Sequence, residues 1–284
     1  MEVLPEDAWG ESAREYDSFE RKWHFYGTVA DGTIANLKIE VGSRVLELAC
    51  GTGACTLKLS RLASAGRVVA LDSSAGMLAV AGENASAAGA GNVTFVRGDA
   101  GEISGLLAGQ SFDFAVCNSA FWHFPQPEKV LAGLRALLTP SGEFAFSVPS
   151  WVEGREGVRE AFRAKAREVL LAHGLSSEAV DDLSARRARR EIDLPALFHS
   201  SGFEVKRVPF EFKVSRESRA AWRQISMFSG GRRLSWLPAE LDPAAQNEIR
   251  AELDAWRRAN FPREPTESRW RIYVGRRAEE WAAQ

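Results

Sequence analysis

Residues 47 to 53 read Glu47-Leu48-Ala49-Cys50-Gly51-Thr52-Gly53 and are the most informative part of the chain. They follow the apolar pair Val45-Leu46 and precede a helix-compatible segment, residues 54–62. This pattern predicts a strand, a glycine turn and a helix, an arrangement that lets a backbone approach a nucleotide-like ligand closely. Glycine lacks Cβ, so it takes a positive φ in such a turn and leaves room against the main chain.

Two common nucleotide-binding turns do not fit these residues. A phosphate-binding P-loop needs a lysine in the turn, whereas Lys58 lies well inside the predicted helix. A dinucleotide fold needs a third glycine where this chain has Thr56. Glu47, at the approach to the turn, would repel a phosphate and would suit a cationic ligand.

The next two apolar runs are each followed or ended by an acidic residue, Asp72 and Asp99. Because the carboxyl ends of parallel strands meet at one edge of a sheet, both carboxylates should lie near the glycine turn. The alternatives are local ones: Asp72 as the N-cap of the following helix, and Asp99 as a turn former.

Apolar runs and helical patterns alternate along the chain, which predicts an α/β fold with a mostly parallel sheet covered on both faces. Strands are predicted near 44–48, 67–71, 93–97, 112–117, 142–148, 203–213 and 269–276, and helices near 53–63, 74–88, 103–108 and 127–138. With 284 residues and 45% hydrophobic composition, the chain supports one domain with one substantial core. Its ligand-binding core is expected at residues 43–150.

Segments outside this core are predicted to be helical. Aromatic residues at three- to four-residue spacing predict one aromatic-faced helix within residues 1–42, which either packs on the core or covers the ligand. They are Tyr16, Phe19, Trp23, Phe25 and Tyr26. Residues 151–192 and 214–268 are expected to form cap elements, and 193–213 with 269–276 a last helix and the final strands. The second cap element carries Trp222, Ile225, Met227, Phe228 and Trp236.

The turn and the runs after it resemble the motifs of class I S-adenosylmethionine-dependent methyltransferases, most closely the small-molecule branch of ubiquinone- and menaquinone-type enzymes. The matching segments are residues 45–53, 69–74, 95–100, 112–123 and 137–144. The most common form of the first motif has glycine where this chain has Ala49, and alanine permits the close approach with a negative φ. The resemblance covers roughly residues 40–150 and a final hairpin. It implies a Rossmann-like, doubly wound, seven-stranded, mostly parallel sheet with an antiparallel last strand and helical cap insertions.

The resemblance also implies S-adenosylmethionine as the cofactor and assigns residues to it. The candidates are Glu47, Ala49, Gly51, Gly53, Asp72, Ser73, Met77, Asp99, Ala100, Asn118 and Ser119, with Tyr16 and Tyr26 as contacts from the N-terminal helix. Asp72 would accept both ribose hydroxyls, and Asp99 would reach the adenine amine. Glu47 would help to hold the methionine ammonium, or it is a buried acid bonded to turn amides. Met77 would pack on the adenine face or in the core.

Three residues after the fourth strand are candidates for the site of methyl transfer. Phe121 and Trp122 are the candidate substrate residues, with a core role as the alternative. His123 is the candidate general base, or else a structural hydrogen-bonding residue. The other histidines, His24, His173 and His199, show no metal-ligand spacing, so no metal is expected. No Gly-x-Ser-x-Gly elbow supports serine hydrolysis.

Net charge and cysteine content limit the expected binding partners and the expected cellular compartment. The formal charge is −2, which gives no global attraction to nucleic acid, so DNA is not an expected partner. Residues 1–150 carry 11 basic and 17 acidic side chains, and the remainder carries 25 and 21. This excess of basic residues reflects solvated helix faces or a patch that faces an anionic substrate or RNA. Cys50, Cys55 and Cys117 lack CxxC spacing and suit the core of a reduced, cytoplasmic protein. The chain begins with acidic residues and has no long apolar run. We therefore expect that the protein is neither exported nor inserted into a membrane.

These patterns predict a methyltransferase that acts on a small, hydrophobic or aromatic acceptor. O-methylation is the first expectation, with C- or N-methylation next. The resemblance ties an Asn-Pro-Pro-Tyr motif to the methylation of amides and exocyclic amines in nucleic acid or protein, and this chain has no such motif. Its nine tryptophans suit a pocket that desolvates an apolar ligand. The alternatives are an RNA methyltransferase that uses the arginine-rich C-terminal half, a catalytically silent cofactor-binding regulatory or scaffold subunit, and an enzyme that converts the cofactor itself. A homodimer is the candidate assembly.

Overall fold

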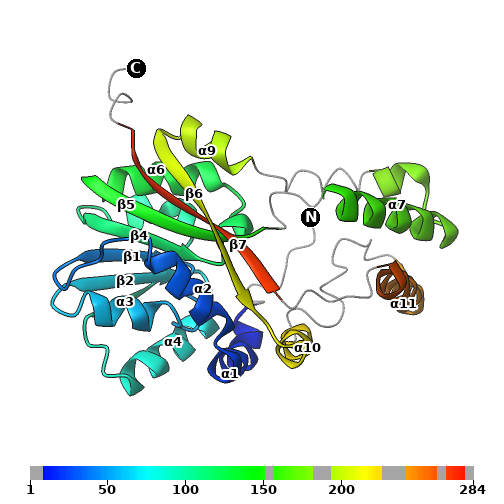
Figure 1. The fold of residues 1–284 in the computed structure, drawn as a ribbon, viewed down its shortest axis with the longest axis horizontal. Coiled ribbons are helices and arrows are strands. Elements are labelled where there is room, and N and C mark those ends of the chain that lie inside the picture. Colours follow the sequence, from blue (N-terminus) through cyan, green and yellow to red (C-terminus); the bar gives the residue numbers. More distant parts are fainter. Residues whose placement is uncertain (1–8, 151–155, 182–192, 226–240, 261–266, 279–284) are drawn as a thin grey trace. The chain divides into compact units, whose positions relative to one another are not determined.

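The computed structural model describes residues 9–150, 156–181, 193–225, 241–260 and 267–278 (Figure 1). The chain divides into two compact units. One unit comprises, within the described ranges, residues 9–150, 193–214 and 267–278, and the other comprises 156–181, 215–225 and 241–260. Among the described residues, no helix combines the length and the apolar character that crossing a bilayer requires.

Seven strands of the first unit form one sheet in the order β3-β2-β1-β4-β5-β7-β6 (Figure 1). They are β1 (Arg44–Leu48), β2 (Arg67–Asp72), β3 (Val93–Arg97), β4 (Phe112–Asn118), β5 (Leu138–Pro149), β6 (Phe203–Lys213) and β7 (Glu267–Arg277). The first five strands pair in parallel, and β7 is antiparallel to both of its neighbours. The predicted fold class is therefore confirmed.

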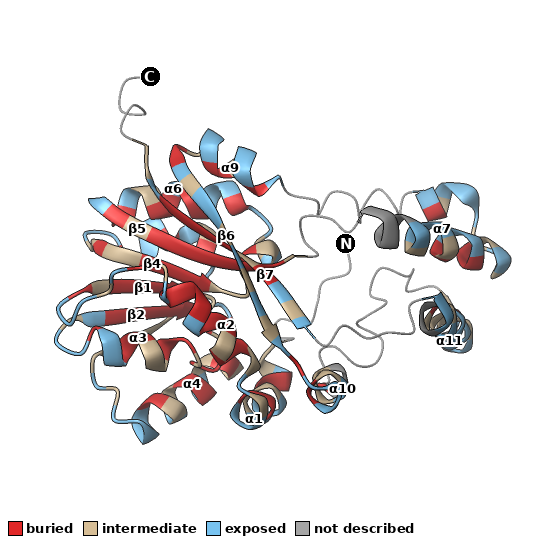
Figure 2. Cartoon of the chain, viewed as in Figure 1, coloured by how far each residue is buried: buried red, intermediate tan, exposed pale blue. Residues whose placement is uncertain are grey.

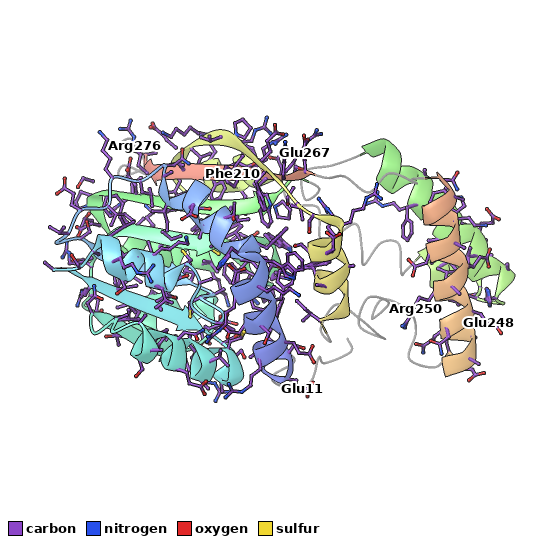
Figure 3. All side chains as sticks on the ribbon, turned by 60° about the horizontal axis from the view of Figure 1, so that its bottom comes forward. Glu11, Phe210, Glu248, Arg250, Glu267 and Arg276 are labelled. Atoms are coloured by element: carbon purple, nitrogen blue, oxygen red, sulfur yellow. The ribbon has the colours of Figure 1, made fainter. Side chains whose placement is uncertain are left out.

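The strand predictions hold to within two residues except at β5. This strand begins at Leu138 rather than near residue 142, because Leu138 pairs with Phe112 before the register shifts and Phe114 pairs with Glu143. In β7, Glu267 and Arg276 lie near opposite ends, and Phe210 of β6 lies between them (Figure 3).

Helices cover both faces of the sheet, as the buried strands require. They are α1 (Ala13–Trp23), α2 (Phe25–Ile34), α3 (Thr56–Leu62), α4 (Ala75–Ala87), α5 (Ile103–Leu106), α6 (Pro127–Leu137) and α9 (Leu194–Ser200). Helices α2 and α3 pack on one face, where Ala30 and Leu59 join Ala145 of β5 in one buried cluster. On the opposite face, Phe144 and Phe146 lie 5.3 and 6.0 Å, between ring centroids, from Phe198 of α9. Figure 2 shows β1, β4 and β5 buried along most of their length.

The single aromatic-faced helix predicted before the first strand is wrong, because two helices occupy this segment. His24 has a left-handed φ of 49° and separates α1 from α2. The carboxylate of Glu20 then accepts hydrogen bonds from the Tyr26 and Gly27 amides, both at 2.8 Å, and so caps the start of α2. Burial raises the pKa of Glu20, and these amide bonds oppose that effect. The break lets Tyr26 stack on Tyr16 of α1, with ring centroids 4.9 Å apart.

The second unit contains α7 (Glu156–Ala172), α10 (Arg216–Gln224) and α11 (Pro243–Asn260), and residues 177–181 are also helical. Helices α7 and α11 share a buried cluster in which Val169 and Leu170 meet Ile249 and Leu253. The segments predicted as cap elements supply this unit, and their role as a cap stays a prediction. Met227, Phe228 and Trp236 lie outside the described residues.

Candidate functional site

The turn between β1 and α3 is built from three residues with a positive φ. Ala49, Gly51 and Gly53 have φ values of 53°, 56° and 91°. The Cys50 amide donates to the carbonyl of Leu71 at 3.0 Å, which ties the turn to the end of β2. Ala49 thus lacks the negative φ with which alanine would permit the close approach. Its backbone lies in the left-handed region, which typically costs a residue with a Cβ about 1–2 kcal/mol.

Ala49→Gly should therefore raise the free energy of unfolding by about 0.5–1 kcal/mol, because glycine relieves this strain but loses more backbone entropy on folding. Urea unfolding would measure the change. Ala79→Gly is the matched control: Ala79 is an exposed residue of α4, where glycine should lower stability by about 1 kcal/mol. A lower stability for Ala49→Gly would contradict the strain argument.

Asp72, at the end of β2, is bonded to the glycine turn and to the start of α4. Its Oδ2 accepts from the Gly51 amide at 2.8 Å, and its Oδ1 accepts from the Ser74 amide at 2.9 Å. The residue is 8% exposed and lines the pocket described below. A carboxylate in this position can accept hydrogen bonds from the hydroxyls of a ligand in the pocket.

Asp99 combines the local role and the pocket position that the sequence left open. Its Oδ1 accepts from the Gly101 amide at 2.6 Å and caps the short 3₁₀ helix Ala100–Glu102. The residue is exposed and lines the same pocket as Asp72. The two strand-end carboxylates therefore face one cavity, as the parallel arrangement requires.

Glu47 lies behind the turn, outside the lining of the pocket. The residue is 1% exposed, and its Oε2 accepts a hydrogen bond of 2.6 Å from the Thr56 hydroxyl. Burial raises the pKa of Glu47 to about 8. The carboxyl is therefore mostly protonated at neutral pH and presents little charge to a ligand. This placement favours the buried-acid alternative, with a hydroxyl donor in place of the turn amides.

Asn118 and Ser119 end β4 beside the turn. The Asn118 side-chain amide donates to the carbonyl of Tyr26 at 3.1 Å, and its Oδ1 accepts from the Ser147 hydroxyl at 3.0 Å. The Ser119 amide donates to that same Ser147 oxygen at 3.0 Å, with the Ser119 backbone at a φ of 62°. These bonds fix the end of β4 against α2 and β5.

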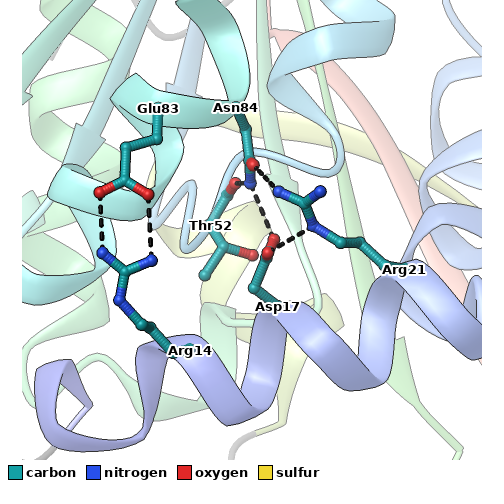
Figure 4. A network of polar contacts seen from close by, with 6 residues as sticks. All are labelled: Arg14, Asp17, Arg21, Thr52, Glu83 and Asn84. Atoms are coloured by element: carbon teal, nitrogen blue, oxygen red, sulfur yellow. Dashed lines mark hydrogen bonds and ion pairs between the residues drawn. The ribbon is translucent and has the colours of Figure 1, made fainter. Parts of the chain in front are cut away.

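Helix α1 supplies Tyr16 to the lining of the pocket described below. Polar contacts hold this helix against α4 and the glycine turn (Figure 4). Arg14 makes a two-pronged ion pair with Glu83 of α4, at 2.8 and 3.0 Å. The Asn84 side-chain amide donates to Asp17 of α1 and to the carbonyl of Thr52 in the glycine turn, both at 2.8 Å. Asn84 thus connects α1, α4 and the turn through one side chain.

Backbone contact completes the attachment of the N-terminal segment to α4. A Cβ on Gly76 would lie 2.5 Å from the Cα of Gly10, so these two backbones meet in a way that a larger residue would prevent. Beside this contact, Trp9 and Tyr16 pack against Met77 of α4. Burial and the nearby Tyr26 raise the pKa of Tyr16, so its hydroxyl is neutral at physiological pH.

The strand ends and the N-terminal segment surround a cavity of about 860 Å³, open solvent at its mouth included. The predicted residues that line it are Tyr16, Ala49, Gly51, Asp72, Ser73, Met77, Asp99, Ala100, Asn118, Ser119 and His123. Their convergence from the ends of strands β1 to β4 and from helices α1 and α4 makes this cavity the candidate site.

Five predicted residues lie outside the lining: Glu47, Gly53, Tyr26, Phe121 and Trp122. Phe121 is fully buried and stacks on Phe146, with ring centroids 4.8 Å apart, which is its core alternative. Trp122 lies 6.1 Å, centroid to centroid, from Trp270 of β7. Tyr26 and Gly53 contact residues of the lining or the turn. The Tyr26 carbonyl accepts from the Asn118 side chain, and the Gly53 amide donates to the Cys50 carbonyl within the turn.

Sequence reasoning missed part of the lining: Trp9, Leu71, Gly98, Ala120, Phe124 and Pro125. Trp9 lies outside the three- to four-residue aromatic spacing that begins at Tyr16, so this spacing did not indicate that Trp9 lines the pocket. It meets His123 edge to face, with ring centroids 5.5 Å apart. His123 is exposed, and this pair lies in the lining between the N-terminal segment and the end of β4.

Comparison with known proteins identifies a family. A family model described as a methyltransferase domain matches residues 39–190. The chain is 39% identical over 108 residues to a trans-aconitate 2-methyltransferase of Deinococcus radiodurans, which covers 38% of each protein. It is 30% identical over 112 residues to a demethylmenaquinone methyltransferase of Shouchella clausii, or 39% of this chain and 47% of that protein. The matches thus span less than half the length of these curated relatives.

Solved structures share the fold. YcgJ of Bacillus subtilis aligns with a TM-score of 0.55 at 18% identity, over 88% of this chain and 98% of that one. A methyltransferase of Geobacter sulfurreducens, solved with S-adenosylhomocysteine, aligns with a TM-score of 0.52 at 22% identity, over 93% and 98%. Since the family model covers more than half of the residues, the chain belongs to the methyltransferase domain family.

Proposed function

We propose that this protein is an S-adenosylmethionine-dependent methyltransferase that acts on a small, hydrophobic or aromatic acceptor. Family membership and the convergence of Asp72, Asp99 and the glycine turn on one cavity support this proposal. The single observation that carries it is the position of Asp72: this strand-end carboxylate accepts from the Gly51 and Ser74 amides and lines the same cavity as Asp99 and the glycine turn.

The residues of the pocket fit this cofactor group by group. Asp72 would accept the two ribose hydroxyls, and Asp99 would accept from the adenine amine. The left-handed turn at Ala49 and Gly51 leaves the backbone open to a ligand. Met77 and Tyr16 offer apolar surface beside them. Bound S-adenosylmethionine supplies a methyl group already activated by the positive sulfur.

The protein's own contribution is then mainly positioning. Holding two reactants in line and excluding water supplies about 7–11 kcal/mol of a barrier. The bonds of Asn118 and Ser147 fix the end of β4, and Asn84 fixes the turn and α1 together. Such fixed walls require no nucleophilic side chain, in agreement with a lining that offers backbone, aromatic rings and carboxylates.

The acceptor would enter beside Trp9, Phe124 and Pro125, which line the pocket next to His123. These side chains present aromatic and apolar surface, which suits a flat, apolar molecule. We place O-methylation first, with His123 as the base that removes the hydroxyl proton. If so, His123→Gln should slow methylation of a phenol but not of a tertiary amine, because only the phenol carries a proton to remove.

The function is tested by ligand binding and turnover together. S-adenosylmethionine and S-adenosylhomocysteine should raise the melting temperature, whereas a nicotinamide dinucleotide or a nucleoside triphosphate should not. A panel of phenols, carboxylates and quinols with isotope-labelled methyl donor would then identify the acceptor. A melting temperature raised only by the nicotinamide dinucleotide or the triphosphate would reject the proposal. Labelling of RNA alone would move the acceptor class to nucleic acid.

A further inference from the structure

Asn84 of helix α4 uses both ends of its side-chain amide. Its nitrogen donates to the carboxylate of Asp17 in α1 and to the carbonyl of Thr52, both at 2.8 Å. Its oxygen accepts from the guanidinium of Arg21, also in α1. An amide nitrogen carries two donors, so both donors have acceptors while the oxygen faces a cation.

Asp17 and Arg21 together determine which way this amide points. They are bonded to each other, with 2.6 Å between Arg21 Nε and Asp17 Oδ2, and the Asp17 side chain is 14% exposed. If the Asn84 amide were flipped, its oxygen would face the Asp17 carboxylate and its nitrogen would face the guanidinium. Acceptor would then meet acceptor at one contact, and donor would meet donor at the other. Helix α1 therefore keeps a donor directed at the carbonyl of Thr52.

The Thr52 carbonyl belongs to the middle of the glycine turn. Thr52 is 2% exposed and lies between Gly51 and Gly53, which both have a positive φ. Glycine restricts its own backbone little, so the shape of such a turn depends on the contacts made with it. Two peptide groups of this turn have side-chain partners: the Gly51 amide donates to Asp72, and the Thr52 carbonyl accepts from Asn84.

We propose that Asn84 is a positioning residue of the glycine turn, and that Asp17 and Arg21 influence the affinity for the cofactor through it. None of these three side chains lines the pocket, so none is a candidate ligand contact. They act through the turn on Gly51 and Asp72, which do line the pocket. The inference rests on the proposed function, since it presupposes that S-adenosylmethionine binds in this cavity.

A second contact between the same two helices provides a matched comparison (Figure 4). Arg14 of α1 and Glu83 of α4 form the two-pronged ion pair at 2.8 and 3.0 Å, and Glu83 directly precedes Asn84. Their side chains are 74% and 54% exposed. This pair attaches α1 to α4, as the bond between Asp17 and Asn84 does, but its two hydrogen bonds join the helices without including the turn.

The test measures the dissociation constant for S-adenosylhomocysteine by isothermal titration with the full-length chain, well below the melting temperature of each variant. Asn84→Ala should raise this constant about tenfold, because the turn loses its donor at Thr52. Asp17→Ala should raise it about threefold or more, because the amide loses an acceptor and Arg21 loses its partner. Arg14→Ala is the matched control and should change it by less than about twofold.

Two further variants keep this test decisive. Asn84→Asp preserves the size of the side chain and can still pair with Arg21, but it has no donor for the Thr52 carbonyl. It should bind as weakly as Asn84→Ala, even if the alanine variant folds poorly. Combining Asp17→Ala with Asn84→Ala should weaken binding no further than Asn84→Ala alone, because Asp17 acts through Asn84.

Equal weakening by Arg14→Ala and Asp17→Ala would mean that looser attachment of α1, rather than the orientation of Asn84, changes the affinity. That result would overturn the inference, as would an Asn84→Asp variant that binds as tightly as the wild type. Additive losses in the double variant would also contradict it. Failure of the wild-type protein to bind S-adenosylhomocysteine would instead reject the proposed function, and the inference with it.

Discussion

Asp72→Ala should weaken the binding of S-adenosylmethionine at least tenfold in isothermal titration. Each charge-assisted hydrogen bond to a carboxylate typically contributes about 1.5–3 kcal/mol, and in the proposed complex this side chain accepts from the ribose hydroxyls. The substitution also removes the acceptor of the Gly51 and Ser74 amides, so the turn loses a contact that shapes the pocket. An affinity equal to that of the wild type would remove Asp72 from the site.

Asp72→Asn separates charge from shape and should also bind weakly. Both carboxylate oxygens accept from backbone amides, whereas asparagine has one accepting oxygen and one donating nitrogen. Either the Gly51 or the Ser74 amide must then face the side-chain nitrogen of the asparagine, which is itself a donor. Loss of binding in the asparagine variant, together with a retained fold, would show that the carboxylate itself is required.

The matched control is Asp113→Ala. Asp113 also accepts from a backbone amide, that of Arg44 at 2.9 Å, but lies near the opposite end of β4, outside the pocket lining. The Arg44 guanidinium lowers the pKa of Asp113. This variant should lose some stability and keep its affinity for the cofactor. Weakened binding in both variants would mean that general destabilisation, rather than the site, explains the result for Asp72.

The sheet could be predicted from the sequence because each strand is a short apolar run bounded by turn residues, a signal carried by neighbouring residues alone. The strand-end carboxylates followed from the same logic, since parallel strands place Asp72 and Asp99 at one edge whatever the side-chain details. Helix boundaries at the N-terminus did not follow. The break at His24 depends on Glu20 folding back to cap α2, which aromatic spacing does not record.

The details of the turn were also beyond local patterns. The positive φ of Ala49 is imposed by bonds to β2 and Asp72, residues more than twenty positions away in the chain. The protonation state of Glu47 likewise depends on its burial by elements far away in the chain. The sequence therefore indicated an acidic residue near the ligand, but it did not indicate that this residue is mostly neutral. Trp9, which lines the pocket, lies next to the point where the backbones of Gly10 and Gly76 meet, a contact between residues far apart in the chain.

Glu47→Gln should make the protein more stable at alkaline pH and change its stability little near pH 5. Burial raises the pKa of Glu47 to about 8, whereas an unfolded glutamate titrates near 4.3. Between these values the folded state keeps a proton that the unfolded state has lost, so the wild-type free energy of unfolding falls as pH rises. At about 1.4 kcal/mol per pH unit, the fall attributable to this group reaches at most about 5 kcal/mol above pH 8. Glutamine carries no ionisable proton and escapes this loss, while its oxygen still accepts from Thr56.

Urea unfolding at pH 5, 7 and 9 would measure the divergence, which should appear mostly between pH 5 and 8 and then level off. Glu178→Gln is the matched control, because it removes the same charge from an exposed position of the second unit, where burial imposes no such cost. A constant difference between wild type and Glu47→Gln across this pH range would mean that Glu47 is ionised in the folded protein at neutral pH. That result would restore its charge to the neighbourhood of the ligand, and with it the case for a direct electrostatic role.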